Sequence, residues 1–205
     1  MRLYSKYILP VLIQWACSNG SSDTKREAVV PMACGRVLEI GIGSGNNLPH
    51  YDKSKVSHLT ALDPLEELWR KCRIDLSELG FEVKYLKGGA EEIPANNSTF
   101  DTVVSTFTLC SVNEPNSVLK EIHRVLKPGG RLIFSEHGKS PKKNVVRMQN
   151  MLNPLWRRVS GGCNLNRDIA ALLEDNGFIT IDLTTQYMPG WQLTSYSYWG
   201  SASRK

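Results

Sequence analysis

The stretch VLEIGIGSG, Val37–Gly45, decides the fold of this chain, because an apolar strand runs there directly into a glycine-rich turn. Glycine lets the backbone adopt positive φ angles and approach a ligand closely, since it has no Cβ atom. In open α/β sheets, ligands bind beyond the carboxyl ends of the strands, where this turn would lie. The stretch therefore predicts a ligand site at the end of the first strand of a largely parallel sheet.

Strands and helices alternate along the rest of the chain, and this order predicts a parallel sheet with right-handed crossovers. The last two strands follow each other without a helix, so one of them should be antiparallel, at or near the edge. The predicted fold is α/β, a Rossmann-like, doubly wound, seven-stranded and mostly parallel sheet with one antiparallel strand. The elements are expected at strands 36–40, 58–63, 82–86, 100–107, 131–136, 178–184 and 194–203, and helices 65–79, 117–126 and 167–176.

The 205 residues predict a single domain, with 41% hydrophobic and 22% charged residues as in soluble globular proteins. We divide it into an N-terminal helical cap (1–34), a cofactor-binding core (35–137), and a lid or substrate segment with the final strands (138–205). Five scattered cysteines without a CxxC pair argue against disulfides and a metal site, and favour a cytoplasmic location. The apolar run 7–17 is too short to span a bilayer and predicts an amphipathic helix.

The spacing of the glycines narrows the ligand class. A dinucleotide fingerprint requires G-x-G-x-x-G, but Asn46 stands where the third glycine would fall. Asp63 closes the second strand, where a carboxylate can accept hydrogen bonds from both ribose hydroxyls. That carboxylate would suit a nicotinamide dinucleotide equally well, so it does not discriminate.

Five motifs in order resemble those of class I S-adenosylmethionine-dependent methyltransferases and together cover residues 36–136. They are VLEIGIGSG (37–45), Asp63-Pro64, GAEEIP (89–94), Phe100-Asp101 and LKPGG (126–130). The resemblance implies S-adenosylmethionine as cofactor and S-adenosylhomocysteine as product. It implies that Glu39 and the glycine turn hold the methionine moiety, Asp63 the ribose, and the 90–91 segment the adenine. The implied cofactor-binding residues are Glu39, Gly41, Ile42, Gly43, Ser44, Gly45, Asp63, Pro64, Ala90, Glu91, Thr106, Phe107 and Thr108.

One departure from the family concerns the adenine. Many relatives carry an aspartate at the position of Gly89, where it accepts a hydrogen bond from the adenine amino group. Glu91 or a backbone carbonyl must replace that acceptor here. Asp101 is interpreted as a structural acid at the start of its strand.

Three further stretches are similar to the methyltransferase-like seven group, thiol S-methyltransferases associated with membranes in animals, and to its bacterial relatives. They are TLCSV (108–112), SEH (135–137) and GCNL (162–165). The chain is also similar to ubiquinone-biosynthesis and phosphatidylethanolamine N-methyltransferases. The leading hypothesis is methyl transfer to a small apolar acceptor, with a thiol ahead of oxygen or nitrogen. The alternatives are a phospholipid headgroup or quinone precursor as acceptor, and a non-catalytic cofactor-binding protein.

His137, just past the fifth strand, is the candidate base or orienting group, with a local hydrogen-bonding role as the alternative. Tyr51, Trp156 and Cys163 are candidate substrate-binding residues, although Cys163 could be structural. Cys110 is expected to be a buried apolar residue rather than a nucleophile.

The segment 139–167 holds seven basic and no acidic residues, together with apolar residues at helical spacing that Pro154 should interrupt. It is either a surface helix packed on the sheet or a lid over an apolar acceptor that contacts anionic membrane lipid. No nucleic-acid recognition module accompanies the charge. An apolar helix face within residues 1–20 is expected either to enclose the acceptor with this segment or to pack on the sheet. The oligomeric state is not predicted.

Overall fold

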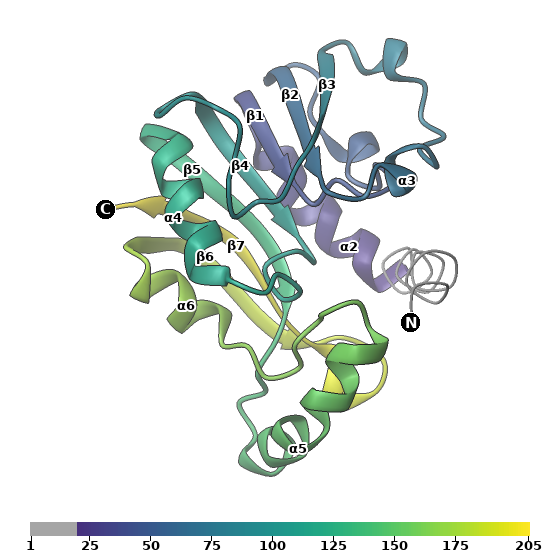
Figure 1. Ribbon diagram of the computed structural model, residues 1–205, viewed down its shortest axis with the longest axis vertical. Helices are drawn as coiled ribbons and strands as arrows, with labels where there is room; N and C mark the ends of the chain where they lie inside the picture. Colours follow the sequence, from purple (N-terminus) through teal and green to yellow (C-terminus); the bar gives the residue numbers. More distant parts are fainter. Residues whose placement is uncertain (1–19) are drawn as a thin grey trace.

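The computed structural model describes residues 20–205, so the helix expected at 7–17 lies outside the described residues. The described chain forms a seven-stranded sheet in the order β3-β2-β1-β4-β5-β7-β6 (Figure 1). All neighbouring strands pair in parallel except β7, which runs antiparallel to both β5 and β6. The expected fold is confirmed, with the antiparallel strand next to the edge. The strands are β1 (Gly35–Ile40), β2 (Val56–Asp63), β3 (Glu82–Lys87), β4 (Phe100–Thr106), β5 (Leu126–His137), β6 (Phe178–Tyr187) and β7 (Tyr196–Arg204).

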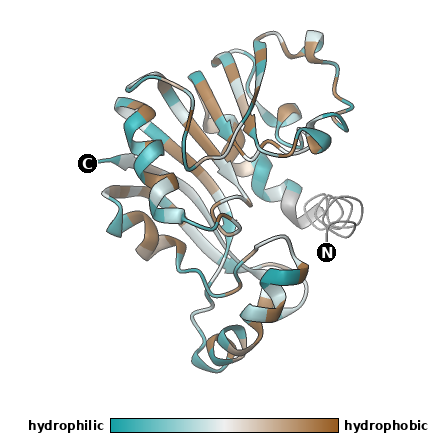
Figure 2. Ribbon diagram, in the orientation of Figure 1, coloured by the Kyte–Doolittle hydropathy of each residue, from teal (hydrophilic) through white to brown (hydrophobic). Residues whose placement is uncertain are grey.

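Helices cover both faces of the sheet. The helices α4 (Pro115–Val125) and α6 (Ile169–Asp175) pack on one face, where residues such as Leu119 and Phe134 are fully buried. The helix α2 (Gly20–Val29) and the short 3-10 helices η2 (Val30–Met32) and η3 (Leu48–His50) cover the other. Hydrophobic stretches run along the central strands (Figure 2), as expected for strands buried on both faces. This core holds the carboxyl ends of β2, β1, β4 and β5 side by side.

The helix expected over 65–79 is wrong. The chain forms only the short α3 (Glu66–Trp69) and, after a turn, the 3-10 helix η4 (Leu76–Leu79). The carboxylate of Asp75 accepts a hydrogen bond from the Ser77 N–H and begins η4 separately. The apolar stripe is only partly buried, since Leu65 is 43% exposed. Without burial of a continuous face, tertiary packing does not extend the helix.

The basic segment forms one long helix, α5 (Lys143–Val159), which contains Pro154. The expected interruption is therefore wrong, although Pro154 has no N–H to donate within the helix. The helix α5 lies at the end of the molecule beyond the carboxyl end of β5 (Figure 1) and contacts the short α7 (Gln192–Ser195). One apolar row of α5 faces away from the protein: Met148, Met151, Leu155 and Val159 are 46–69% exposed. Among the described residues, no helix is both long and apolar enough to cross a membrane.

Candidate active site

A cavity of about 840 Å³ lies at the carboxyl ends of β2, β1, β4 and β5. This is where an open α/β sheet binds its ligand. Gly45 and Tyr51, expected in the site, do not line this cavity. The predicted residues that do line it are Glu39, Gly41, Ile42, Gly43, Ser44, Asp63, Pro64, Ala90, Glu91, Thr106, Phe107, Thr108, His137, Trp156 and Cys163.

The glycines of the turn have different roles. Gly43 has φ +55°, and a Cβ atom built there would meet no atom within 4 Å, as expected for backbone that faces an open cavity. A Cβ on Gly41 would lie 2.1 Å from Thr108 Oγ1, so Gly41 lets the turn pack against the loop after β4. A Cβ on Gly45 would collide with Leu48 instead. Gly43 is therefore the glycine whose missing side chain leaves room for a ligand.

Asp63 connects the end of β2 to the glycine turn. Its Oδ2 accepts a hydrogen bond from the Gly43 N–H at 2.9 Å, and its Oδ1 accepts one from the Leu65 N–H at 2.7 Å. Burial raises the pKa of Asp63, and these two N–H groups partly offset that effect. Each carboxylate oxygen can accept a further hydrogen bond, so Asp63 can still bind two hydroxyl groups in the cavity.

Glu39 is a buried carboxyl group at the end of β1. Its two oxygens accept hydrogen bonds from Tyr51 Oη at 2.6 Å and from Asn47 Nδ2 at 2.8 Å. Burial raises the pKa of Glu39 to about 7, although both hydrogen bonds act in the opposite direction. Tyr51, expected beside the substrate, thus lies behind Glu39 and orients it.

This pKa predicts that the free protein loses stability as the pH rises. The folded-state pKa of Glu39, about 7, lies above its ordinary 4.5, so the stabilisation is complete below pH 4.5 and is lost as the pH rises through 7. The shift corresponds to about 3 kcal/mol. Urea unfolding at several pH values should show wild type losing stability relative to Glu39→Gln by that order between pH 5 and pH 8.5. A constant difference between the two proteins would contradict the assignment.

The segment after β3 lines the part of the cavity that is expected to hold the adenine. A Cβ atom on Gly89 would lie 2.8 Å from Glu91 Oε2. The Glu91 carboxylate therefore occupies space beside Gly89, where relatives carry an acidic side chain. This placement fits the expectation that Glu91 replaces that acceptor.

The loop after β4 is held by Glu136, a residue that the sequence did not single out. Its fully buried carboxylate accepts hydrogen bonds from Ser105 Oγ and from the N–H groups of Thr108, Leu109 and Cys110, at 2.8–3.1 Å. Burial raises the pKa of Glu136, and these donors partly offset that effect. Glu136 thereby fixes the backbone between the cofactor turn and Cys110.

Two cations from α2 also line the cavity and were missed. Lys25 donates a hydrogen bond to Ser197 Oγ at 3.1 Å, and Arg26 Nε donates one to Asn47 Oδ1 at 3.0 Å. Their charged groups lie 4.6 Å and 5.2 Å from the centre of the Phe107 ring. They precede the first motif, in a segment where no sequence signal pointed to a ligand. Both are over 90% buried, so they make this part of the cavity electropositive.

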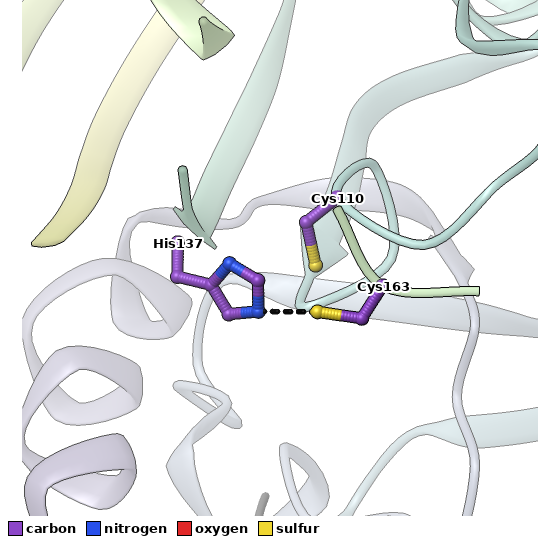
Figure 3. Close-up of side chains that lie close together, drawn as sticks. All are labelled: Cys110, His137 and Cys163. Atoms are coloured by element: carbon purple, nitrogen blue, oxygen red, sulfur yellow. Dashed lines mark hydrogen bonds between the residues drawn. The ribbon is translucent and has the colours of Figure 1, made fainter. Parts of the chain in front are cut away.

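Cys110, His137 and Cys163 form a compact group, here called the cysteine–histidine cluster, at the end of the cavity nearest β5 (Figure 3). The Sγ atom of Cys163 lies 2.7 Å from Nε2 of His137. A hydrogen bond to Cys163, together with burial, raises the pKa of Cys110 well above its ordinary value. Burial lowers the pKa of His137, but the neighbouring Cys110 outweighs this effect and the pKa ends above its ordinary value. Cys110 was predicted to be a buried apolar residue rather than a nucleophile; it is 1% exposed, as predicted, and it also lines the cavity.

The helix α5 contributes the wall beside this cluster. Trp156 donates its Nε1–H to Cys163 Sγ at 3.4 Å, and its ring lies 6.4 Å from the ring of Trp191. The predicted residues Trp156 and Cys163 are therefore in direct contact. Together with Trp191, they give the cavity an aromatic and sulfur-rich end opposite Asp63.

Comparisons with known proteins give the family of this chain. Residues 38–134 match the family described as "Methyltransferase domain". The chain is 32% identical to human thiol S-methyltransferase TMT1B, covering 91% of this chain and 80% of that protein. It is 34% identical to rat TMT1B, covering 75% of this chain and 64% of that protein. It is 36% identical to phosphatidylethanolamine N-methyltransferase of Cereibacter sphaeroides, covering 58% of this chain and 62% of that protein.

A crystal structure of a Thermotoga maritima S-adenosylmethionine-dependent methyltransferase shares the fold. Its TM-score is 0.62 at 21% identity, covering all of this chain and 95% of that one. The cavity fits the cofactor: Gly43 leaves open space in a cavity that the buried carboxyl groups of Glu39 and Asp63 also line. The comparisons identify an enzyme rather than a non-catalytic binding protein. The chain belongs to the S-adenosylmethionine-dependent methyltransferases.

Proposed function

We propose that this methyltransferase acts on a small apolar thiol and forms a methyl thioether. The observation that supports this acceptor most directly is the cysteine–histidine cluster at the end of the cavity opposite Asp63. Sulfur and aromatic groups favour a polarisable acceptor over a strongly hydrated one. The similarity to proteins named thiol S-methyltransferases points to the same substrate class.

The reaction requires little of the protein beyond alignment and one proton transfer. S-adenosylmethionine supplies an activated methyl group on a sulfonium. The protein has to hold the acceptor sulfur in line with that group and exclude water. A free thiol has a pKa near 8.5 and is only a few per cent thiolate at pH 7. The acceptor therefore needs a group that removes its proton.

We assign that role to His137. Its ring lies at the carboxyl end of β5, lines the cavity and contacts Cys163. Cys163 and Trp156 then position the ring and the acceptor. Asp63, Glu91 and the glycine turn bind the cofactor at the other end and take no part in the proton transfer.

One observation favours a second candidate acceptor, a lipid headgroup or a quinone precursor. The exposed row of Met148, Met151, Leu155 and Val159 lies on a helix that also carries four basic residues and no acidic ones. A helix with an apolar face and a basic face suits the surface of an anionic membrane. In this alternative, α5 would bring the mouth of the cavity to a lipid acceptor.

An acceptor screen with labelled cofactor tests the proposal. Wild-type protein should methylate small aromatic or aliphatic thiols at least tenfold faster than phenols, quinols or phosphatidylethanolamine in vesicles. Preference for the lipid or the quinol would overturn the thiol assignment and favour the second candidate.

His137→Gln should lower kcat for the thiol by at least 100-fold, since general acid–base catalysis contributes about 10²–10⁴. The affinity for S-adenosylhomocysteine, measured by calorimetry, should stay within threefold. His58→Gln is the matched control, because His58 is on the surface and 56% exposed. Thiol turnover that is unchanged in the His137 variant would contradict the assigned role.

A further inference from the structure

The cysteine–histidine cluster contains the donor atoms of a metal site. The two sulfur atoms and the ring nitrogen of His137 all lie within 4.8 Å of one another. Two ligands on one tetrahedral zinc ion are roughly 3.3–3.8 Å apart, given bond lengths of about 2.3 Å to sulfur and 2.0–2.1 Å to nitrogen. Cys163 Sγ and His137 Nε2, now 2.7 Å apart, would move apart by about 1 Å to share an ion. The set Cys₂His is one that zinc accepts at catalytic sites.

Hydrogen bonds already hold the two chain segments that carry the cysteines next to each other. Asn164, the residue after Cys163, donates both its backbone N–H and its Nδ2 to the carbonyl oxygen of Cys110, at 2.8 Å and 3.0 Å. The N–H of Cys110 is held by Glu136, the residue before His137. All three chain segments are thus tied to one another by hydrogen bonds that do not use the sulfur atoms. Such supporting contacts are what orients the ligands of metal sites.

The surroundings of the cluster suit a bound thiolate pair. Cys110 and Cys163 are 1% and 8% exposed, so an ion between them would be shielded from bulk water. Trp156 Nε1–H donates to Cys163 Sγ, a contact that stabilises negative charge on sulfur. His137 directs its Nε2 at Cys163 and not into open solvent (Figure 3). All three residues also line the cavity, which leaves one side of the cluster open.

We propose that Cys110, His137 and Cys163 bind one zinc ion whose fourth position faces the cavity and takes the sulfur of the acceptor thiol. The catalytic part of this proposal rests on the proposed function, whereas the metal site itself does not. Zinc with two cysteine thiolates and a neutral imidazole has no net charge. Binding the acceptor would release its proton to solvent and leave a thiolate on the ion.

The methyl group is then transferred in a single nucleophilic displacement. A lone pair of the bound sulfur forms the new bond to the methyl carbon as the bond from that carbon to the sulfonium sulfur breaks. The products are a neutral thioether and S-adenosylhomocysteine. A thioether is a weaker ligand than a thiolate, so the product leaves the ion. In this state His137 is a ligand, and the ion takes over its role in removing the proton.

Metal content tests the site without reference to activity. The full chain, kept reduced and dialysed against zinc and then against metal-free buffer, should retain about one zinc per chain by elemental analysis. Cobalt should replace it and give the thiolate-to-cobalt absorption of a Cys₂His site. Cys110→Ser and Cys163→Ser should retain less than a tenth as much metal. Cys34→Ser is the matched control, because Cys34 is exposed and outside the cluster.

Measurements of ligand-induced stabilisation and of thiol methylation distinguish the possible outcomes. Each variant should show the same stabilisation by S-adenosylhomocysteine as wild type, which excludes unfolding as the cause of metal loss. Removal of zinc by a chelator should slow thiol methylation at least tenfold, and added zinc should restore it. Absence of zinc and cobalt binding in wild type would overturn the proposal even if thiols are methylated. Zinc bound without any thiol turnover would leave the site standing and overturn the proposed function.

Discussion

Replacement of Gly43 by valine should abolish binding of S-adenosylmethionine while the protein stays folded. Gly43 has φ +55° and faces the cavity, and a Cβ atom there would meet no protein atom within 4 Å. The valine side chain would therefore project into the cavity that Glu39 and Asp63 also line. Saturating S-adenosylhomocysteine should raise the melting temperature of wild type by several degrees and leave that of the variant unchanged. Only a protein that binds the ligand is stabilised by it.

The control for this change is Gly129→Val. Gly129 has φ +76° and also has no atom within 4 Å of a built Cβ, but it lies in the irregular stretch of β5 between Leu126 and Arg131, outside the cavity. Both substitutions impose a similar backbone strain, of about 1–2 kcal/mol, so both should lower the melting temperature of the free protein. Only the Gly129 variant should keep the full ligand shift. A normal shift in the Gly43 variant would place the cofactor elsewhere.

The sheet could be predicted from the sequence because its central strands are short apolar runs, separated by segments that contain glycine or proline. The runs in β1 and β4 are mostly buried and therefore almost continuously apolar, a pattern that the sequence shows directly. The prediction of one helix over 65–79 was wrong although the apolar spacing suited a helix. The capping hydrogen bond of Asp75 begins a separate 3-10 helix, and the apolar face is only partly buried. The continuation of α5 through Pro154 likewise depends on its surroundings, which the local sequence does not encode.

The two halves of the site differ in how far the sequence could predict them. Residues that face the cofactor are adjacent in short motifs, so one strand and its turn place several of them at once. The cysteine–histidine cluster instead draws its members from three segments far apart in the chain. The absence of a CxxC pair suggested that no metal site exists, since sequence spacing cannot show ligands that only the fold brings together. Glu136 and Lys25 were missed for the same reason.

Asp63→Ala should weaken cofactor binding at least tenfold. Asp63 is 6% exposed at the end of β2 and lines the cavity, and each of its carboxylate oxygens accepts one backbone N–H. Hydrogen bonds to a charged group contribute about 1.5–3 kcal/mol, and 1.4 kcal/mol is a factor of ten in affinity. Calorimetric titration with S-adenosylhomocysteine measures the loss. Asp101→Ala is the control, since Asp101 bonds Lys127 and the Arg36 N–H outside the cavity.

The Asp63 variant also loses two hydrogen bonds that hold the glycine turn, so affinity alone would not prove contact with the ribose. A ligand without the 2′-hydroxyl group separates the two effects, as in a double-mutant cycle. Wild type should bind S-(2′-deoxyadenosyl)homocysteine at least fivefold more weakly than S-adenosylhomocysteine, because the carboxylate then lacks one donor. The Asp63→Ala protein should bind both ligands equally, since it has no carboxylate to lose a partner. An equal preference for the hydroxyl group in both proteins would show that Asp63 only shapes the turn.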